Sequence, residues 1–237
     1  MIKAGSATDS QHAYALWKTT ECGCAAGITL GVFSTEPIPG AISDDIPQEA
    51  LNFAVHYLQK ILITLLDQEC KDMNQAKALI GKQLKKLNDS ISYISRKTGQ
   101  GIYMSGTVCY IAERKYICQA FGDARIYFWQ NGQGTIQSKK TKEALDGPYI
   151  TDAIGGPAVW AADFCEGPFE EGSQLICTTV PPTEEPLQAV MASLIHTNQT
   201  VLPVSIYKIL EHAGIPIAVL TIAQTVDYRK AVAGDDQ

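Results

Sequence analysis

The order of its elements predicts that this chain is an antiparallel α+β protein. Segments with the two-residue hydrophobic period of strands and segments with helical spacing come in groups: strands, two long helices, strands, two helices and one strand. A doubly wound protein would instead alternate strand and helix. Hydrophobic residues make up 46% and charged residues 19% of the 237 positions, the balance of a globular chain. Because no repeat or linker interrupts it, we predict a single domain over 1–223 and a polar tail over 224–237.

The first half of the chain predicts a strand pair followed by two long helices. Two apolar runs within 13–33, separated by a polar turn, indicate adjacent strands. Asp45 is a candidate N-cap for the first helix, and Pro47 suits its first turn. The second helix is expected to begin near Asp72 and to stop at Gly99. Apolar residues recur at helical spacing at Leu51, Val55, Leu58, Leu62 and Leu65 and at Met73, Ala76, Ile80, Leu84, Leu87, Ile91 and Ile94. Long helices joined by a short turn pack antiparallel.

Beyond residue 102 the hydrophobic period becomes two. The runs 103–111, 116–120, 125–130 and 135–138 predict a meander of strands joined by tight turns. The remaining expected elements are short strands at 149–154, 158–164 and 175–178, helices at 184–196 and 203–213, and a last strand at 217–222.

Charge and cysteine usage argue against several classes of function. The formal net charge is −6, which disfavours nucleic acids and anionic membranes as partners. The densest basic group, Lys82, Lys85 and Lys86, is typical of a solvated helix face. No apolar run reaches the length of about 18 residues that spans a membrane, and the N-terminus lacks the apolar core of a signal peptide.

The seven cysteines are Cys22, Cys24, Cys70, Cys109, Cys118, Cys165 and Cys177. Several sit inside apolar runs, which is typical of buried thiols. One residue separates Cys22 from Cys24, fewer than in a zinc half-site. We therefore expect seven free thiols in a reduced, cytoplasmic protein.

Several segments resemble, in family order, the type-2C metal-dependent protein phosphatases. The run Gly122-Asp123-Ala124-Arg125 is similar to the family's Gly-Asp-Ser-Arg signature. Further resemblances lie at 10–14 (Asn-Gln-Asp-Ala-Tyr), 31–33 (the start of Gly-Val-Phe-Asp-Gly), 105–108 (Met-Gly-Thr-Thr), 150–155 (Leu-Thr-Arg-Ala-Leu-Gly) and 171–177 (Pro-Gly-Asp-x-Leu-Leu-Leu-Cys). The resemblance covers about 5–223. It implies a four-layer α-β-β-α sandwich, with two antiparallel sheets face to face and a helix pair outside each.

The resemblance also implies where two divalent ions and a phosphate would bind, and the expected ligands are missing there. The family's ligand positions fall on Ala7, His12, Ser34, Thr35, Thr179, Ile215 and Pro216. Hard divalent ions need oxygen ligands, mostly carboxylates, and Ile215 and Pro216 have no side-chain oxygen. Without metal, the pKa of water stays far above neutral pH, and water is a poor nucleophile. We expect no cofactor and no catalysis: a pseudophosphatase.

Only Gly122, Asp123 and Arg125 are retained from the family's motifs. Arg125 could bind a phosphorylated peptide, because guanidinium pairs with phosphate through two hydrogen bonds. Alternatively, Asp123 and Arg125 bond the backbone and fix the start of a strand, which is the interpretation we favour.

Three functions remain open on the sequence. The favoured one is an inactive scaffold or regulator that binds another protein of unknown identity. The second is an active, divergent serine/threonine phosphatase with a rearranged metal site, for which Glu36, Asp44, Asp45 and His12 are candidate ligands. The third is a small-molecule sensor that uses the vacated groove.

The loops that would hold metal in the family are apolar and rich in proline in this chain. They contain Pro37, Ile38, Pro39, Val180, Pro181, Pro182, Ile215 and Pro216. Proline stiffens these loops, and an exposed apolar patch on a globular protein often marks a partner site. These residues are the candidate partner surface, unless their side chains fold inward and plug the groove.

Overall fold

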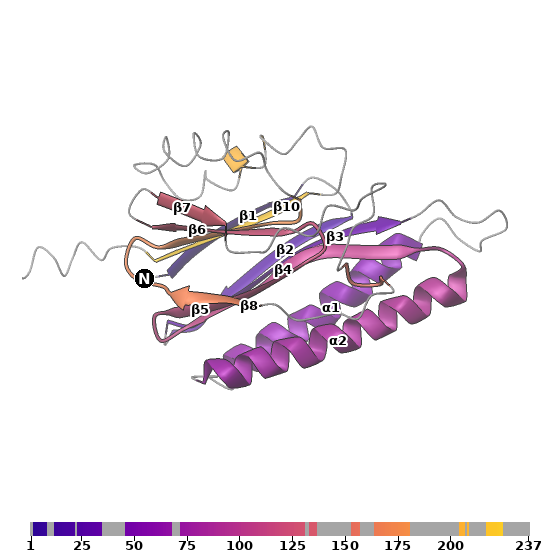
Figure 1. Cartoon of the computed structure of the whole chain (residues 1–237), viewed down its shortest axis with the longest axis horizontal. Coiled ribbons are helices and arrows are strands. Elements are labelled where there is room, and N and C mark those ends of the chain that lie inside the picture. Colours follow the sequence, from indigo (N-terminus) through magenta and orange to yellow (C-terminus); the bar gives the residue numbers. More distant parts are fainter. Residues whose placement is uncertain are drawn as a thin grey trace, which may run out of the picture.

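The computed structural model describes residues 2–8, 12–21, 23–34, 46–67, 72–130, 133–136, 153–156, 164–180, 204–206, 208 and 217–224. Two five-stranded antiparallel sheets pack face to face, and two long helices cover the outer face of one of them (Figure 1). The predicted α+β sandwich is therefore confirmed. Among the described residues, no helix is long and apolar enough to cross a membrane.

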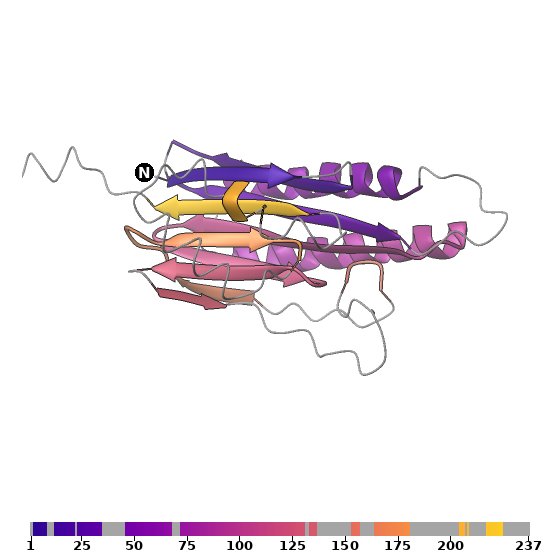
Figure 2. The same cartoon turned by 90° about the horizontal axis from the view of Figure 1, so that it is seen from above.

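Each sheet combines strands from distant parts of the chain. Sheet A has the order β1 (Ile2–Thr8), β10 (Ala218–Gln224), β9 (Gln174–Thr178), β6 (Arg125–Gln130) and β7 (Gln133–Ile136). Sheet B has the order β2 (Ala13–Thr19), β3 (Ala25–Ser34), β4 (Ile102–Ala112), β5 (Lys115–Phe121) and β8 (Phe164–Pro168). Figure 2 shows the strands of the two sheets from above, with the helices behind them.

The helices α1 (Ile46–Asp67) and α2 (Met73–Thr98) lie side by side on sheet B, as their spacing predicted. The Asp72 carboxylate caps α2 by accepting a hydrogen bond from the Asn74 N–H at 2.8 Å. Gly99 ends α2 in the left-handed region at φ 71°. The Tyr57 hydroxyl donates to Gln83 Oε1 at 2.6 Å and joins the two helices. The expected cap of α1, Asp45, lies outside the described residues.

The predicted meander over 103–138 is wrong in its topology. β4 and β5 form a hairpin in sheet B, but the chain then crosses to sheet A, where β6 pairs with β7 and β9. Gly122 makes the crossing at φ +65°, and a Cβ there would lie 2.9 Å from Ser105 Cα. A period of two cannot distinguish a hairpin from a change of sheet, because both alternate side chains in the same way.

Several boundaries also differ from expectation. β1 was not predicted, and β8 begins at Phe164, where the strand expected at 158–164 ends. Within 153–156 the structure has an isolated bridge between Ile154 and Met104 rather than a strand. The last strand, β10, runs to Gln224 and so takes the first residue assigned to the tail.

The second expected helix pair is described only in part. Residues 184–196 lie outside the described residues, as do most of 203–213 and all of 225–237. Residues 204–206 are helical and lie on the outer side of sheet A, opposite α1 and α2 (Figure 1).

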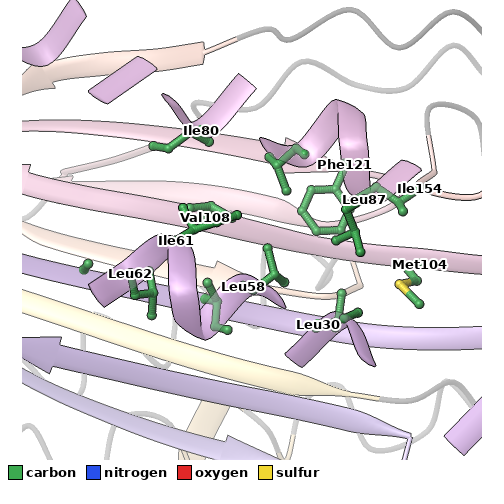
Figure 3. Close-up of a cluster of buried hydrophobic side chains, with 14 of the residues drawn as sticks. Leu30, Leu58, Ile61, Leu62, Ile80, Leu87, Met104, Val108, Phe121 and Ile154 are labelled. Carbon is green, nitrogen blue, oxygen red and sulfur yellow. The ribbon is translucent and has the colours of Figure 1, made fainter. Parts of the chain in front are cut away.

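Two separate clusters of buried side chains stabilise these layers. The helix core lies between sheet B and its helices: Leu58, Leu62 and Leu87 face Val108 and Phe121 across it (Figure 3). The inter-sheet core lies between sheets A and B and contains Cys109, Cys118, Ile126, Leu175, Cys177, Leu220 and Ile222.

Candidate functional site

The strand register brings the described candidate residues to one end of the sandwich. In sheet A, Thr8 lies opposite Ala218 and Arg125 opposite Thr178. In sheet B, Ser34 lies opposite Ile102 at the start of β4. The last residue of β5, Phe121, pairs with Gly106 in the same half of β4. This end, which carries Ala7, His12, Ser34, Gly122, Asp123, Arg125 and Thr179, is called the site end below.

Thr179 is a structural tether rather than an exposed ligand. Its side chain is fully buried, and its hydroxyl accepts a hydrogen bond from the Ala218 N–H at 2.9 Å. Its own N–H donates to the Ala218 carbonyl at 3.1 Å, and its carbonyl accepts from the Ser105 hydroxyl at 2.7 Å. Because Ser105 belongs to β4, this bond joins sheet A to sheet B.

Ser105 was noted in the sequence only as part of a resembling segment, and its role was missed. Its hydroxyl also lies 3.4 Å from the Phe121 carbonyl, just before the crossing at Gly122. Its partner Thr179 is 74 residues away, so no local pattern could reveal the contact. The available signal was weak: a small polar residue within an otherwise apolar strand.

Arg125 bonds to the turn that carries it. One guanidinium nitrogen, Nη1, donates to the carbonyls of Asp123 at 3.1 Å and Ala124 at 2.9 Å. These bonds fix the geometry of the crossing between β5 and β6. They support the structural interpretation of the retained motif over a phosphate-binding one, because part of the donor set is committed to backbone oxygens.

Ala7, His12 and Ser34 are the other described positions at the site end. Ala7 lies within β1, opposite Val219, and has no polar side-chain atom. The His12 carbonyl accepts from the Val32 N–H at 3.0 Å, which extends the β2–β3 pairing. Ser34 is exposed at the end of β3.

The described residues do not fit the two divalent ions that the fold family implies. Such a pair requires several oxygen ligands, mainly carboxylates. Within the described ranges, no three His, Cys, Asp or Glu residues are grouped so that they could hold a metal ion. Asp123 provides a carboxylate at the site end, whereas Thr179 provides a buried neutral hydroxyl. No catalytic step through a metal follows from this set.

Most residues of the candidate partner surface lie outside the described ranges. Thr35, Pro37, Ile38, Pro39, Pro181, Pro182, Ile215 and Pro216 lie outside the described residues, as do Glu36, Asp44 and Asp45. Val180 is described and is only 2% exposed. Its inclusion in a surface patch is therefore wrong for this structure: Val180 points inward, as in the plugged alternative.

Five cysteines in the described ranges are not in a disulfide. These are Cys24, Cys109, Cys118, Cys165 and Cys177. Cys22 and Cys70 lie outside the described residues, and the expectation of seven free thiols stays a prediction.

The fold is similar to that of several bacterial serine/threonine phosphatases. The S. agalactiae enzyme superposes with a TM-score of 0.71 at 13% identity, covering 94% of this chain and 100% of that one. PppA, described as a regulatory component of T6SS in Pseudomonas aeruginosa, gives 0.71 at 12% identity, covering 94% and 97%. Mycobacterium tuberculosis PstP gives 0.68 at 12%, covering 95% and 99%.

No protein-family model matches the sequence, and no curated protein matches it significantly. Structural likeness at such low identity establishes the arrangement of the chain and not its chemistry. The sheet order, the outer helices and these superpositions together show that the chain has the fold of the type-2C-like serine/threonine phosphatases.

Proposed function

We propose that this chain is a catalytically inactive type-2C-like pseudophosphatase that acts by binding another protein. The observation that carries the proposal is the state of Thr179. The resemblance places a metal-binding aspartate at this position, and the chain has instead a fully buried hydroxyl bonded to the backbone of β10. A neutral, buried oxygen that already accepts a hydrogen bond is a poor ligand for a hard divalent ion.

The bonding of Ser105 and Arg125 supports the same proposal. Both residues connect elements at the site end: Ser105 joins β4 to the end of β9, and Arg125 stabilises the turn before β6. In an active metal site, groups at this end would instead be directed at ions and phosphate. Here the hydrogen bonds of both residues hold backbone segments together, which supports a structural role for the site end.

A phosphatase assay separates this proposal from a rearranged active site. Purified protein is incubated with manganese and a phosphothreonine peptide, and phosphate release is measured for wild type, Asp123→Asn and Asp89→Asn. Asp123 is the described acid at the site end, and Asp89 is an exposed carboxylate on α2 that serves as the control. We expect background release from all three proteins. Activity that Asp123→Asn removes and Asp89→Asn retains would establish the active alternative.

Thermal denaturation with manganese gives an independent readout. A ligand of the native state at 100 times its dissociation constant adds about 2.7 kcal/mol of stability. For a chain of this length that would raise Tm by roughly 5–10 °C. We expect no shift, because the described site end lacks the necessary carboxylates. A reproducible rise of several degrees at micromolar manganese would contradict the proposal.

Partner binding is tested with a substitution in the candidate partner surface. Ile38→Glu places a charge in the first of the three apolar loops, and Ile63→Glu places the same charge on α1, where Ile63 is already 41% exposed. Proteins cross-linked to each variant in cells are compared by quantitative mass spectrometry. We expect a partner that Ile38→Glu loses and Ile63→Glu keeps. Identical partner sets, with unchanged Tm for both variants, would move the binding surface away from these loops.

A further inference from the structure

Four cysteines form a continuous row through the inter-sheet core. In the strand register Cys109 lies directly opposite Cys118, and Cys118 directly opposite Cys165. Residues directly opposite each other on neighbouring antiparallel strands point to the same face of a sheet. These three thiols therefore cross β4, β5 and β8 in one line on the face of sheet B that meets sheet A. We call them, with Cys177, the thiol row.

Cys177 continues the row into the other sheet. It lies on β9, and its Sγ is 3.2 Å from Cys109 Sγ. A disulfide requires a sulfur–sulfur distance of about 2.05 Å, so a shift of roughly 1.2 Å would bring the two atoms to bonding distance. Cys109 and Cys177 are thus in contact across the interface between the two sheets.

The row reaches from the interior toward solvent. Cys109, Cys118 and Cys177 are completely buried, whereas Cys165 is partly exposed on β8, an edge strand of sheet B. The Cys165 thiol lies 3.4 Å from the Cys118 carbonyl, so its sulfur faces the row. An oxidant in solution therefore meets Cys165 first, since fully buried thiols are otherwise inert.

The protonation of the inner pair suits exchange chemistry. Burial disfavours the Cys109 thiolate, but hydrogen bonds from Cys118, Cys177 and Thr107 hold the Cys109 pKa below the usual thiol value. The hydrogen bond to Cys109 and burial together raise the pKa of Cys177. The thiolate is the attacking species in disulfide exchange. Within the inner pair, Cys109 is therefore the thiol that is more readily present as a thiolate.

We propose that the thiol row is an oxidation site, at which a peroxide reacts with Cys165 and exchange along the row leaves a disulfide between Cys109 and Cys177 that joins the two sheets. This modification is independent of the proposed pseudophosphatase function. It needs one molecule of hydrogen peroxide or an organic hydroperoxide for each disulfide.

Each step balances in atoms and electrons. The Cys165 sulfur attacks the peroxide, breaks its O–O bond and becomes a sulfenic acid, while the thiol proton leaves with the departing oxygen as water or an alcohol. The Cys118 thiol then condenses with this sulfenic acid, which forms a disulfide and releases the sulfenic oxygen as water. Cys109 then attacks Cys118 Sγ and Cys165 leaves as a thiol. Finally Cys177 attacks Cys109 Sγ and Cys118 leaves, each exchange moving one proton from the attacking to the departing sulfur.

Peptide mapping by mass spectrometry tests the product. Native protein is treated with substoichiometric to equimolar hydrogen peroxide, free thiols are blocked with N-ethylmaleimide in denaturant, and the digest is analysed without reductant. We expect the Cys109–Cys177 cross-link as the main product, reversed by dithiothreitol. We also expect a rise in Tm of roughly 5–10 °C in the oxidised protein. Oxidation that stops at Cys165, or that joins other pairs instead, overturns the proposal.

Variants test the route. Cys165→Ser should slow the formation of the Cys109–Cys177 cross-link at least about tenfold, while Cys24→Ser, which changes a cysteine of the helix core, should leave the rate unchanged. Cys177→Ala should stop the row at a disulfide within sheet B. Equal rates in wild type and Cys165→Ser would show that the oxidant reaches the inner pair directly and would refute the relay. If a variant with a substituted core cysteine fails to fold, the peptide map of the wild-type protein still decides whether the Cys109–Cys177 cross-link forms.

Discussion

The helix core and the inter-sheet core differ in chemistry although they share one sheet. β4 shows the contrast within a single strand: Met104 and Val108 point into the helix core, whereas Ser105, Thr107 and Cys109 occupy the alternate positions on the inter-sheet side. The helix core is mostly hydrocarbon. On the inter-sheet side of β4, the side chains become more polar toward the site end. Ile111 is hydrocarbon and Cys109 carries a thiol, whereas Thr107 and Ser105 carry hydroxyl groups.

The polar side chains between the two sheets form buried hydrogen bonds. The Thr29 and Thr107 hydroxyls are 2.9 Å apart and fully buried, and the Ser105 hydroxyl reaches the Thr179 carbonyl. Such bonds add little net stability but are costly to leave unmade, so they define how two sheets align. The helix layer, in contrast, is held by buried apolar area. The comparison shows that one face of sheet B supplies stability and the other supplies alignment.

Truncating a leucine in the helix core should have the largest effect. Leu87→Ala is expected to lower the free energy of unfolding by about 2–5 kcal/mol, because it removes buried methylene groups and leaves a cavity. Cys109→Ala, equally buried in the inter-sheet core, removes one sulfur atom and should cost clearly less. Urea unfolding of both variants provides the measurement. Equal losses would show that the two cores contribute alike.

Removing the tether between the sheets should have the next largest effect. Ser105→Ala leaves the buried Thr179 carbonyl without its 2.7 Å hydrogen bond and should cost about 1–3 kcal/mol. Ser90→Ala is the control, since the Ser90 hydroxyl bonds to its own helix at an exposed position and should cost within about 0.5 kcal/mol. If both variants unfold at the same urea concentration, the inter-sheet hydroxyls do not align the sheets.

Gln119 is a buried polar residue on the helix side of sheet B and allows a prediction of opposite sign. It lies opposite Val108, is fully buried, and its amide atoms have no hydrogen-bond partner among the described residues. Gln119→Met replaces the amide by an apolar group of similar shape and should raise stability by about 1–3 kcal/mol. Calorimetry of wild type and variant measures the gain. A loss of stability would mean that the Gln119 amide stabilises the helix side of sheet B.

The smallest effect is expected for the ion pair that joins the helix layer to sheet B. Lys77 on α2 lies 2.6 Å from Glu166 on β8, and the two side chains are 24% and 55% exposed. Lys77→Ala should change stability by about 0–1 kcal/mol, and less at high salt, because water and ions screen the pair. Unfolding at low and high salt checks this. A salt-dependent loss beyond about 2 kcal/mol would show that charge, and not apolar area, holds the helices.

The helices and the strand pair at 13–34 could be predicted because their signals are local. Asp72 and Gly99 act within one turn of α2, and the leucines of α1 recur on a single face. The absence of carboxylates at Thr179 and Ser34 could also be read directly, since it depends only on residue identity once the family resemblance is recognised.

The sequence did not show which distant strands pair with each other. β1 was missed because its partner is β10: Gly5 lies opposite Thr221, 216 residues away, and a short strand of small and polar residues has no strong period of its own. The crossing at Gly122 was missed for a similar reason, because the strands on both sides of it were expected in one meander.

The sequence by itself determined the type of most elements, the α+β class and the lack of carboxylates at Ser34 and Thr179, because each follows from neighbouring residues or from the residues themselves. Only the tertiary structure decided which sheet each strand joins, that Thr179 is a buried tether bonded to Ser105, and that four cysteines line up between the sheets. The physical reason is that buried hydrogen bonds and sulfur contacts depend on strand register, which is set by the packing of the whole sandwich.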